Sequence, residues 1–177
     1  MKNVALFGEM GAGKTSVAKI LEDVYGYQKI SLGTKIHSEC KLHGSETREE
    51  MQQYGQSMRK IFGEDTWCKY LEKRLNTEFK DKYKNHLIVI DDARQVNEFY
   101  YFKELGFLPI AVVANEAIRL ERLRKRVNYQ VNQETKNHET EKQARICIQK
   151  CDIVIENNFD NYENLKTAVL QILQNRL

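Results

Sequence analysis

Hydrophobic and polar residues follow one another along the chain in blocks that predict strands alternating with helices. Short apolar runs predict five strands, over Asn3–Phe7, Tyr27–Ser31, Leu87–Ile90, Pro109–Val113 and Ile153–Glu156. Apolar residues spaced by three or four positions predict helices, over Thr15–Tyr25, Val96–Leu105, Ala117–Arg126 and Tyr162–Leu173. Buried strands separated by helices are typical of the α/β class, in which a parallel sheet carries helices on both faces as three layers.

Two long segments depart from this alternation. Residues 34–79 are predicted to be mostly helical, because Thr47 and Glu50 have the spacing of a capping box and an apolar stripe follows that includes Trp67. Residues 127–143 are polar and show no clear period. We therefore expect a single domain over 1–177, with a helical insert at about 31–79 and a polar segment at about 127–143.

Composition narrows the class of protein. The chain has 177 residues, with 28 Lys and Arg against 25 Asp and Glu, which gives a net charge of +3. A charge this small does not indicate a nucleic-acid-binding surface, and no apolar stretch is long enough for a membrane span. The four cysteines show no metal-binding spacing, which is typical of reduced thiols. We expect a cytoplasmic protein, with no nucleic-acid or membrane partner, that is a monomer or a homodimer.

The glycine-rich segment Gly8–Thr15 matches the pattern G-x-x-x-x-G-K-[ST] in full, between a predicted strand and a predicted helix. Such a loop points its backbone N–H groups at phosphate oxygens, and the helix that follows adds the positive end of its dipole. Lys14 would reach the β and γ phosphates, and the Thr15 hydroxyl would bind Mg²⁺. The loop residues expected to bind a nucleoside triphosphate are Gly8, Gly11, Ala12, Gly13, Lys14, Thr15 and Ser16.

Acidic residues follow the third predicted strand. Ligands of open α/β sheets bind at the carboxyl ends of the strands, so a carboxylate there can hold Mg²⁺ through water. Asp91 and Asp92 are adjacent, and on an extended segment their side chains face opposite ways, so one is expected to face the metal. Arg94 would lie close enough to bind a phosphate.

Three arginines of the helix after the fourth strand fall on one face: Arg119, Arg122 and Arg126. A solvated basic helix and a nucleic-acid-binding patch are the alternatives for this set. Beside a phosphate loop the favoured interpretation is that they stabilise the transferred phosphoryl group, with the following polar segment as a lid. Arg145 could add a further cation, whereas His138 fits a surface histidine.

The chain resembles the P-loop nucleoside monophosphate kinases, and more closely the phage-type deoxynucleoside monophosphate kinases. It resembles phosphomevalonate kinase more distantly. Adenylate kinase itself fits poorly, because its D-G-F-P-R pattern and four-cysteine lid are absent. The matching pieces are the phosphate loop, Gln53-Tyr-Gly55-x-x-x-Arg59, Phe62-Gly63-x-Asp65-x-Trp67, Asp92-x-Arg94-x-x-Asn97-Glu98, Arg119-x-x-Arg122-x-x-x-Arg126, His138-Glu-x-Glu141 and Asp152-x-Val-Ile-x-Asn157.

The resemblance implies roles for individual residues. Asp92 would be the acid near the metal, with Asp91 as the second choice. Lys14, Arg94, Arg122 and Arg126 would be catalytic, while Arg119 and Asn157 would lie at the ATP, Asn157 near the donor base. The acceptor would be bound by Ser31, Thr34, Lys35, Arg59, Trp67 and Arg94. Trp67 could stack on the acceptor base, although its place in an apolar stripe also predicts core packing.

The predicted function is Mg²⁺-dependent transfer of the ATP γ-phosphoryl group to a nucleoside monophosphate, with a deoxynucleotide favoured. An acceptor phosphate that is already ionised needs no general base, so catalysis would consist of positioning and charge neutralisation. Two alternatives stay open. One is a kinase of another small phosphorylated metabolite, such as phosphomevalonate, and the other is a non-catalytic switch that binds nucleoside triphosphates.

Overall fold

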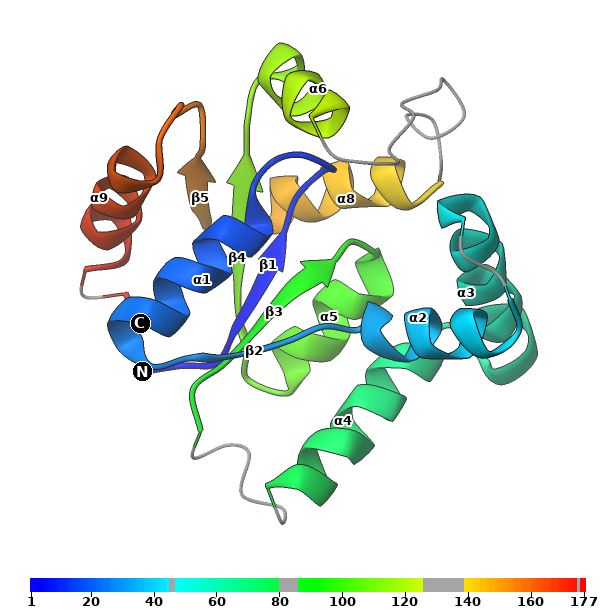
Figure 1. Ribbon diagram of the computed structural model, residues 1–177. Helices are drawn as coiled ribbons and strands as arrows, with labels where there is room; N and C mark the ends of the chain where they lie inside the picture. The colour runs from blue at the N-terminus through cyan, green and yellow to red at the C-terminus, as the bar shows by residue number, and fades with distance from the viewer. Residues whose placement is uncertain (45–46, 80–85, 126–138, 175) are drawn as a thin grey trace.

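The computed structural model describes residues 1–44, 47–79, 86–125, 139–174 and 176–177 (Figure 1). Its centre is a sheet of parallel strands, in the order β2-β3-β1-β4-β5. The strands are β1 (Val4–Phe7), β2 (Gln28–Ile30), β3 (Ile88–Ala93), β4 (Leu108–Val113) and β5 (Ile153–Glu156). All five predicted strands are confirmed. β1 and β3 lie in the middle of the sheet and are almost wholly buried, which explains the continuous apolar runs Val4–Phe7 and Ile88–Ile90.

Helices cover both faces of the sheet, as predicted (Figure 1). α1 (Lys14–Tyr25) and α9 (Tyr162–Leu173) pack on one face, and α5 (Val96–Glu104) and α8 (Glu139–Lys150) pack on the other. Each face has its own core cluster of buried apolar side chains. α6 (Glu116–Arg124) lies beyond the carboxyl end of β4. This arrangement is the three-layer α/β fold expected from the sequence.

The helical insert between β2 and β3 contains α2 (Gly33–Leu42), α3 (Arg48–Phe62) and α4 (Thr66–Glu78), which lie to one side of the sheet (Figure 1). The capping box predicted at the start of α3 is confirmed, since Thr47 and Glu50 satisfy each other's backbone N–H groups. The apolar stripe of α4 packs into the core cluster beside α5. The insert therefore rests on α5, close to the carboxyl ends of β2 and β3.

Two boundaries differ from the expectation. α8 begins at Glu139, inside the segment 127–143 that was expected to be an irregular lid. The buried positions of this helix are Glu141, Ala144 and Cys147, so its first turn places a charged residue on the inner face and shows no apolar stripe in the sequence. Residues 126–138 lie outside the described residues. They include Arg126, His138 and most of the expected lid. β3 also runs on to Ala93, so the two acids are part of the strand.

All four cysteines are buried and unpaired. Burial raises the pKa of the Cys147 and Cys151 thiols to about 12, and it also raises the pKa of Cys68 and Cys40. High pKa values and burial make thiols unreactive.

Within the described parts of the chain, no helix is long and apolar enough to cross a membrane.

Candidate active site

The glycine-rich segment forms a tight loop between β1 and α1. Gly11 and Gly13 have φ angles of 77° and 97°, which side chains with a Cβ rarely adopt. A Cβ on Gly11 would also lie 2.6 Å from the carbonyl oxygen of Arg119, and one on Gly13 would lie 2.1 Å from the Asn157 amide. The loop is thus enclosed by α6 and by the segment after β5, and glycine is required at both positions.

Lys14 crosses the inside of this loop. It is buried, and its Nζ donates to the carbonyl oxygens of Gly8 at 2.5 Å and Glu9 at 3.2 Å. Burial, together with the positive charge of Arg94, lowers the pKa of Lys14 from its ordinary value of 10.5 to about 7. The Lys14 amine is therefore placed where an arriving phosphate would stabilise its charged form.

We expect MgATP binding at about pH 8 to be accompanied by uptake of nearly one proton. With a pKa of about 7, the Lys14 amine of the free protein is mostly neutral at that pH. A bound triphosphate favours the charged amine and so raises its pKa. Titration calorimetry in buffers of different ionisation enthalpy measures this uptake, and the Lys14→Met variant should show none. Equal uptake by the two proteins would assign the proton to another group.

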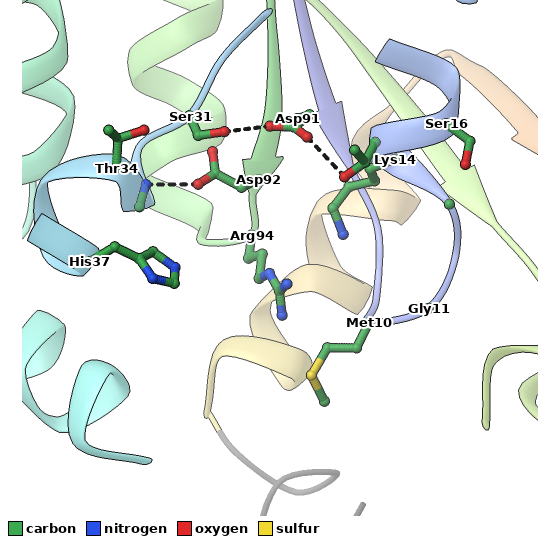
Figure 2. Close-up of a pocket in the computed structure, with 13 residues that line it drawn as sticks. Met10, Gly11, Lys14, Ser16, Ser31, Thr34, His37, Asp91, Asp92 and Arg94 are labelled. Carbon is green, nitrogen blue, oxygen red and sulfur yellow. Dashed lines mark hydrogen bonds between the residues drawn. The ribbon is translucent and has the colours of Figure 1, made fainter. Parts of the chain in front are cut away.

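Asp91 and Asp92 have different partners. Asp91 is buried and accepts hydrogen bonds from the hydroxyls of Thr15 at 2.9 Å and Ser31 at 2.6 Å (Figure 2). Asp92 accepts from the backbone N–H groups of Leu32 at 2.8 Å and Gly33 at 2.7 Å. Burial raises the pKa of Asp92 to about 6, against the effect of these two hydrogen bonds.

These partners favour Asp91, the second choice of the resemblance, over Asp92 as the metal-side acid. Asp91 lies against the Thr15 hydroxyl, the other expected metal ligand, whereas Asp92 holds the turn between β2 and α2. A hydroxyl beside a carboxylate suits Mg²⁺, which prefers oxygen ligands and keeps several waters. The described residues contain no group of three or more His, Cys, Asp or Glu side chains placed to hold a metal ion. The pair Thr15 and Asp91 would thus hold Mg²⁺ together with phosphate oxygens and water.

A cavity of about 490 Å³ lies in front of the loop and extends to α2 (Figure 2). It brings together the phosphate loop, the carboxyl end of β3 and the start of α2. Its lining residues are Met10, Gly11, Gly13, Lys14, Thr15, Ser16, Ser31, Gly33, Thr34, His37, Asp91, Asp92 and Arg94. The cavity therefore unites most of the loop residues expected to bind the triphosphate with Ser31, Thr34 and Arg94 from the expected acceptor side.

Three residues expected to bind the acceptor do not line this cavity. Arg59 is buried and forms an ion pair with Glu98 at 2.8 Å. Trp67 lies in the core cluster, where its Nε1 donates to the Gly55 carbonyl at 3.1 Å, so the core-packing interpretation holds. Lys35 forms an ion pair with Glu39 on the same helix. The sequence pattern placed these side chains near the acceptor region but could not show that each already has a protein partner, although the buried Nε of Arg59 has none among the described residues.

Three further residues of the expected site do not line the cavity and instead contact the backbone of the phosphate loop: Arg119, Arg122 and Asn157. Arg119 forms an ion pair with Glu9 at 3.2 Å. Arg122 donates to the carbonyl oxygens of Asn157 at 3.0 Å and Phe159 at 2.8 Å. Asn157 is buried, and its amide donates to the Ala12 carbonyl at 2.8 Å, so its side chain is held by the phosphate loop, while its place near the donor base stays a prediction.

Asn157→Ala is expected to lower the free energy of unfolding by about 1–3 kcal/mol, because the Ala12 carbonyl and the Arg122 guanidinium each lose a buried partner. The preference for ATP over GTP should stay unchanged. Chemical denaturation and competition binding of the two nucleotides measure these effects. Unchanged stability combined with a lost ATP preference would instead place Asn157 at the base.

Other residues of the site had no role in the sequence interpretation. His37 lines the cavity one helical turn after Thr34, and this spacing is the signal that could have indicated it. Glu98 accepts from Arg59 and from the Arg94 backbone N–H at 2.7 Å, which links α3 to the strand end. Glu141 contacts both the loop and Arg94. Glu98 and Glu141 belong to two of the motifs that carry the family resemblance. A sequence motif does not show which side chains they contact in the fold.

The family profile described as "AAA domain" matches residues 4–144. This match covers most of the chain, including the phosphate loop, the helical insert and the strand that carries Asp91. The chain belongs to the AAA domain family. A search of curated proteins gives no match for this AAA domain protein.

Solved structures share its fold. The shikimate kinase from Acinetobacter baumannii, solved in complex with shikimate, is 20% identical with a TM-score of 0.61, and the match covers 100% of this chain and 96% of that chain. The shikimate kinase from Aquifex aeolicus is 16% identical with a TM-score of 0.57, over 97% and 96% of the two chains. A sugar kinase from Janibacter sp. is 16% identical with a TM-score of 0.57, over 98% and 94%. The AAA domain protein therefore has the fold of P-loop kinases.

Proposed function

We propose that the protein transfers the γ-phosphoryl group of ATP to a small phosphorylated acceptor, and specifically to a nucleoside or deoxynucleoside monophosphate, in the presence of Mg²⁺. The observation that carries this proposal is the continuous cavity, which joins the phosphate loop to Arg94, Ser31, Thr34 and His37. A switch that only binds nucleotide needs no such second compartment. The kinase fold of the structural neighbours supports phosphoryl transfer, and the motif resemblance supports the nucleotide acceptor.

The residues of the cavity suit this reaction. The N–H groups of the loop, the dipole of α1 and the Lys14 amine would hold the donor phosphates. Mg²⁺ bound by Thr15 and Asp91 would supply charge neutralisation at the phosphate oxygens. Arg94 would bind the acceptor phosphate, one oxygen of which forms the new P–O bond as the bond from the γ-phosphorus to ADP breaks. Catalysis then consists of alignment and neutralisation.

A second candidate acceptor is a small metabolite without a base. The structural neighbours include kinases named for shikimate and for a sugar, and the cavity has room for either kind of acceptor. Phosphomevalonate belongs to the same group, and its phosphate could use Arg94 in the same way. A hydroxyl acceptor differs chemically, because its proton must be removed during transfer.

The deciding experiment is an ADP-release assay with MgATP and a panel of acceptors. The panel contains the nucleoside and deoxynucleoside monophosphates, phosphomevalonate and shikimate. We expect at least one nucleotide to raise ADP release about 100-fold or more above the rate without acceptor, and Arg94→Met to raise the KM of that nucleotide. Turnover with a metabolite alone would establish the second candidate. Tight ATP binding without turnover would establish the non-catalytic switch.

A further inference from the structure

Glu141, in the first turn of α8, contacts two segments of the candidate active site at once. One carboxylate oxygen accepts a hydrogen bond from the backbone N–H of Met10 in the phosphate loop at 2.9 Å. The other oxygen pairs with a terminal nitrogen of Arg94 at 2.5 Å. The side chain is only 3% exposed, so water does not compete for these two contacts. A single buried carboxylate thus joins the donor side of the cavity to its acceptor side.

Arg94 is held from behind by this contact. Arg94 lines the cavity, whereas Glu141 does not. Figure 2 shows the Arg94 side chain extending from the end of β3 toward Met10, beside the phosphate loop. Among the described residues, Glu141 is the hydrogen-bond partner of its guanidinium. The remaining N–H donors of the planar fork are therefore available to a phosphate oxygen in the cavity.

A second contact, at the surface, also joins α8 to the same loop. Arg145 lies one turn after Glu141, and it forms an ion pair with Glu9 at 2.8 Å. Ala144, which precedes Arg145 in the sequence, is fully buried. The side of the helix that carries Glu141 and Ala144 therefore packs on the interior. Neighbouring loop residues, Glu9 and Met10, are thus both tied to α8. The helix, the loop and Arg94 form one connected unit through charged hydrogen bonds.

We propose that Glu141 is a positioning residue that sets the distance and direction between the bound donor phosphates and the Arg94 guanidinium. This inference rests on the proposed function, because it concerns a site with a donor and an acceptor phosphate. A free arginine side chain would lose rotational freedom on binding a phosphate, whereas one fixed by a buried carboxylate has lost it already. In-line transfer depends on such alignment, and a displacement of about 1 Å can lower the rate about 100-fold.

Glu141→Gln tests this inference because it changes one contact and spares the other. The glutamine oxygen can still accept from the Met10 N–H, whereas its NH₂ group would face the Arg94 guanidinium, donor against donor. The matched control is Glu139→Gln on the same turn of α8, where the side chain is exposed and bonds to Gln143. Thermal unfolding of both variants shows whether the fold is kept.

The binding probes are ATP and two bisubstrate compounds, diadenosine pentaphosphate and adenosine–thymidine pentaphosphate. We expect Glu141→Gln to weaken the tighter pentaphosphate at least about 10-fold, while ATP affinity changes less than about 3-fold and Glu139→Gln changes neither. In an Arg94→Met background, Glu141→Gln should add less than about 2-fold, because the two residues act as a pair. A loss shared equally by ATP and the pentaphosphate, or an additive double variant, would overturn the inference.

Failure of the proposed function has a different signature. If the wild-type protein binds neither pentaphosphate more tightly than ATP, adenine and thymine nucleotides are refuted as acceptors. The variants are then compared on the acceptor that the ADP-release panel identifies, with an increased KM for that acceptor in Glu141→Gln as the expected result. If the wild type accepts nothing in the panel, both the proposed function and this inference are refuted.

Discussion

Replacing Lys14 with methionine is expected to lower phosphoryl transfer by about 10³-fold or more while the fold is kept. The Lys14 amine lies inside the phosphate loop, where it is buried against the carbonyl oxygens of Gly8 and Glu9. Methionine has a similar shape but no charge, so the donor phosphates lose a cation at the point where negative charge is transferred. Steady-state kinetics with the acceptor from the panel measures the loss.

The same substitution has a defined effect on stability. The unfolded lysine keeps its proton up to about 10.5, whereas the folded one loses it near 7, so the unfolded state binds more protons between these values. The stability of the wild type should therefore rise with pH across this range relative to Lys14→Met. The control is Lys19→Met on the same helix, where the lysine is exposed and paired with Asp23. A Lys14→Met protein with near-normal turnover would refute the site.

We expect Asp91→Asn to lower mainly the turnover and Asp92→Asn to lower mainly the stability. Asp91→Asn should lower turnover about 100-fold, with partial recovery at high Mg²⁺, because the carboxylate beside the Thr15 hydroxyl is lost. Its stability should change little, since its partners are hydroxyls that can rotate to donate or accept. Activity measured against Mg²⁺ concentration tests this assignment.

Asp92→Asn should mainly lower stability, by about 1–3 kcal/mol. Its partners are the backbone N–H groups of Leu32 and Gly33, which cannot reverse direction, so the asparagine NH₂ would face a donor. Chemical denaturation measures the loss, and turnover per folded molecule should fall less than in Asp91→Asn. The opposite pattern, with Asp92→Asn losing Mg²⁺-dependent activity, would restore the assignment implied by the resemblance.

The sequence was sufficient to predict the fold because its signals are local. Apolar runs marked all five strands, and the glycine-rich pattern marked the loop between β1 and α1. The cavity lining likewise contains most of the predicted loop residues together with Arg94. In each of these cases residue type, spacing and the rule that sites lie at the carboxyl ends of strands determine the answer.

What the sequence could not supply was the partner of each charged side chain. Arg59, Arg119 and Arg122 were assigned to phosphates, yet the structure pairs them with Glu98, with Glu9 and with backbone carbonyls. These partners lie far away along the chain, so the spacing of residues within a motif cannot predict them. The sequence likewise could not show which of Asp91 and Asp92 faces the metal, because the contacts of each carboxylate depend on the groups that α1, β2 and α2 bring to it.

The four buried cysteines have a practical consequence for measuring movement in this protein. Since their thiols are shielded and their pKa values are raised, maleimide or nitroxide reagents should leave them unmodified at neutral pH. A cysteine introduced at an exposed position, such as Ser38 on α2 or Lys125 after α6, should then take a label selectively. Paired labels at these two positions would report by spectroscopy whether the insert approaches α6 when nucleotides bind, with the native thiols left in place.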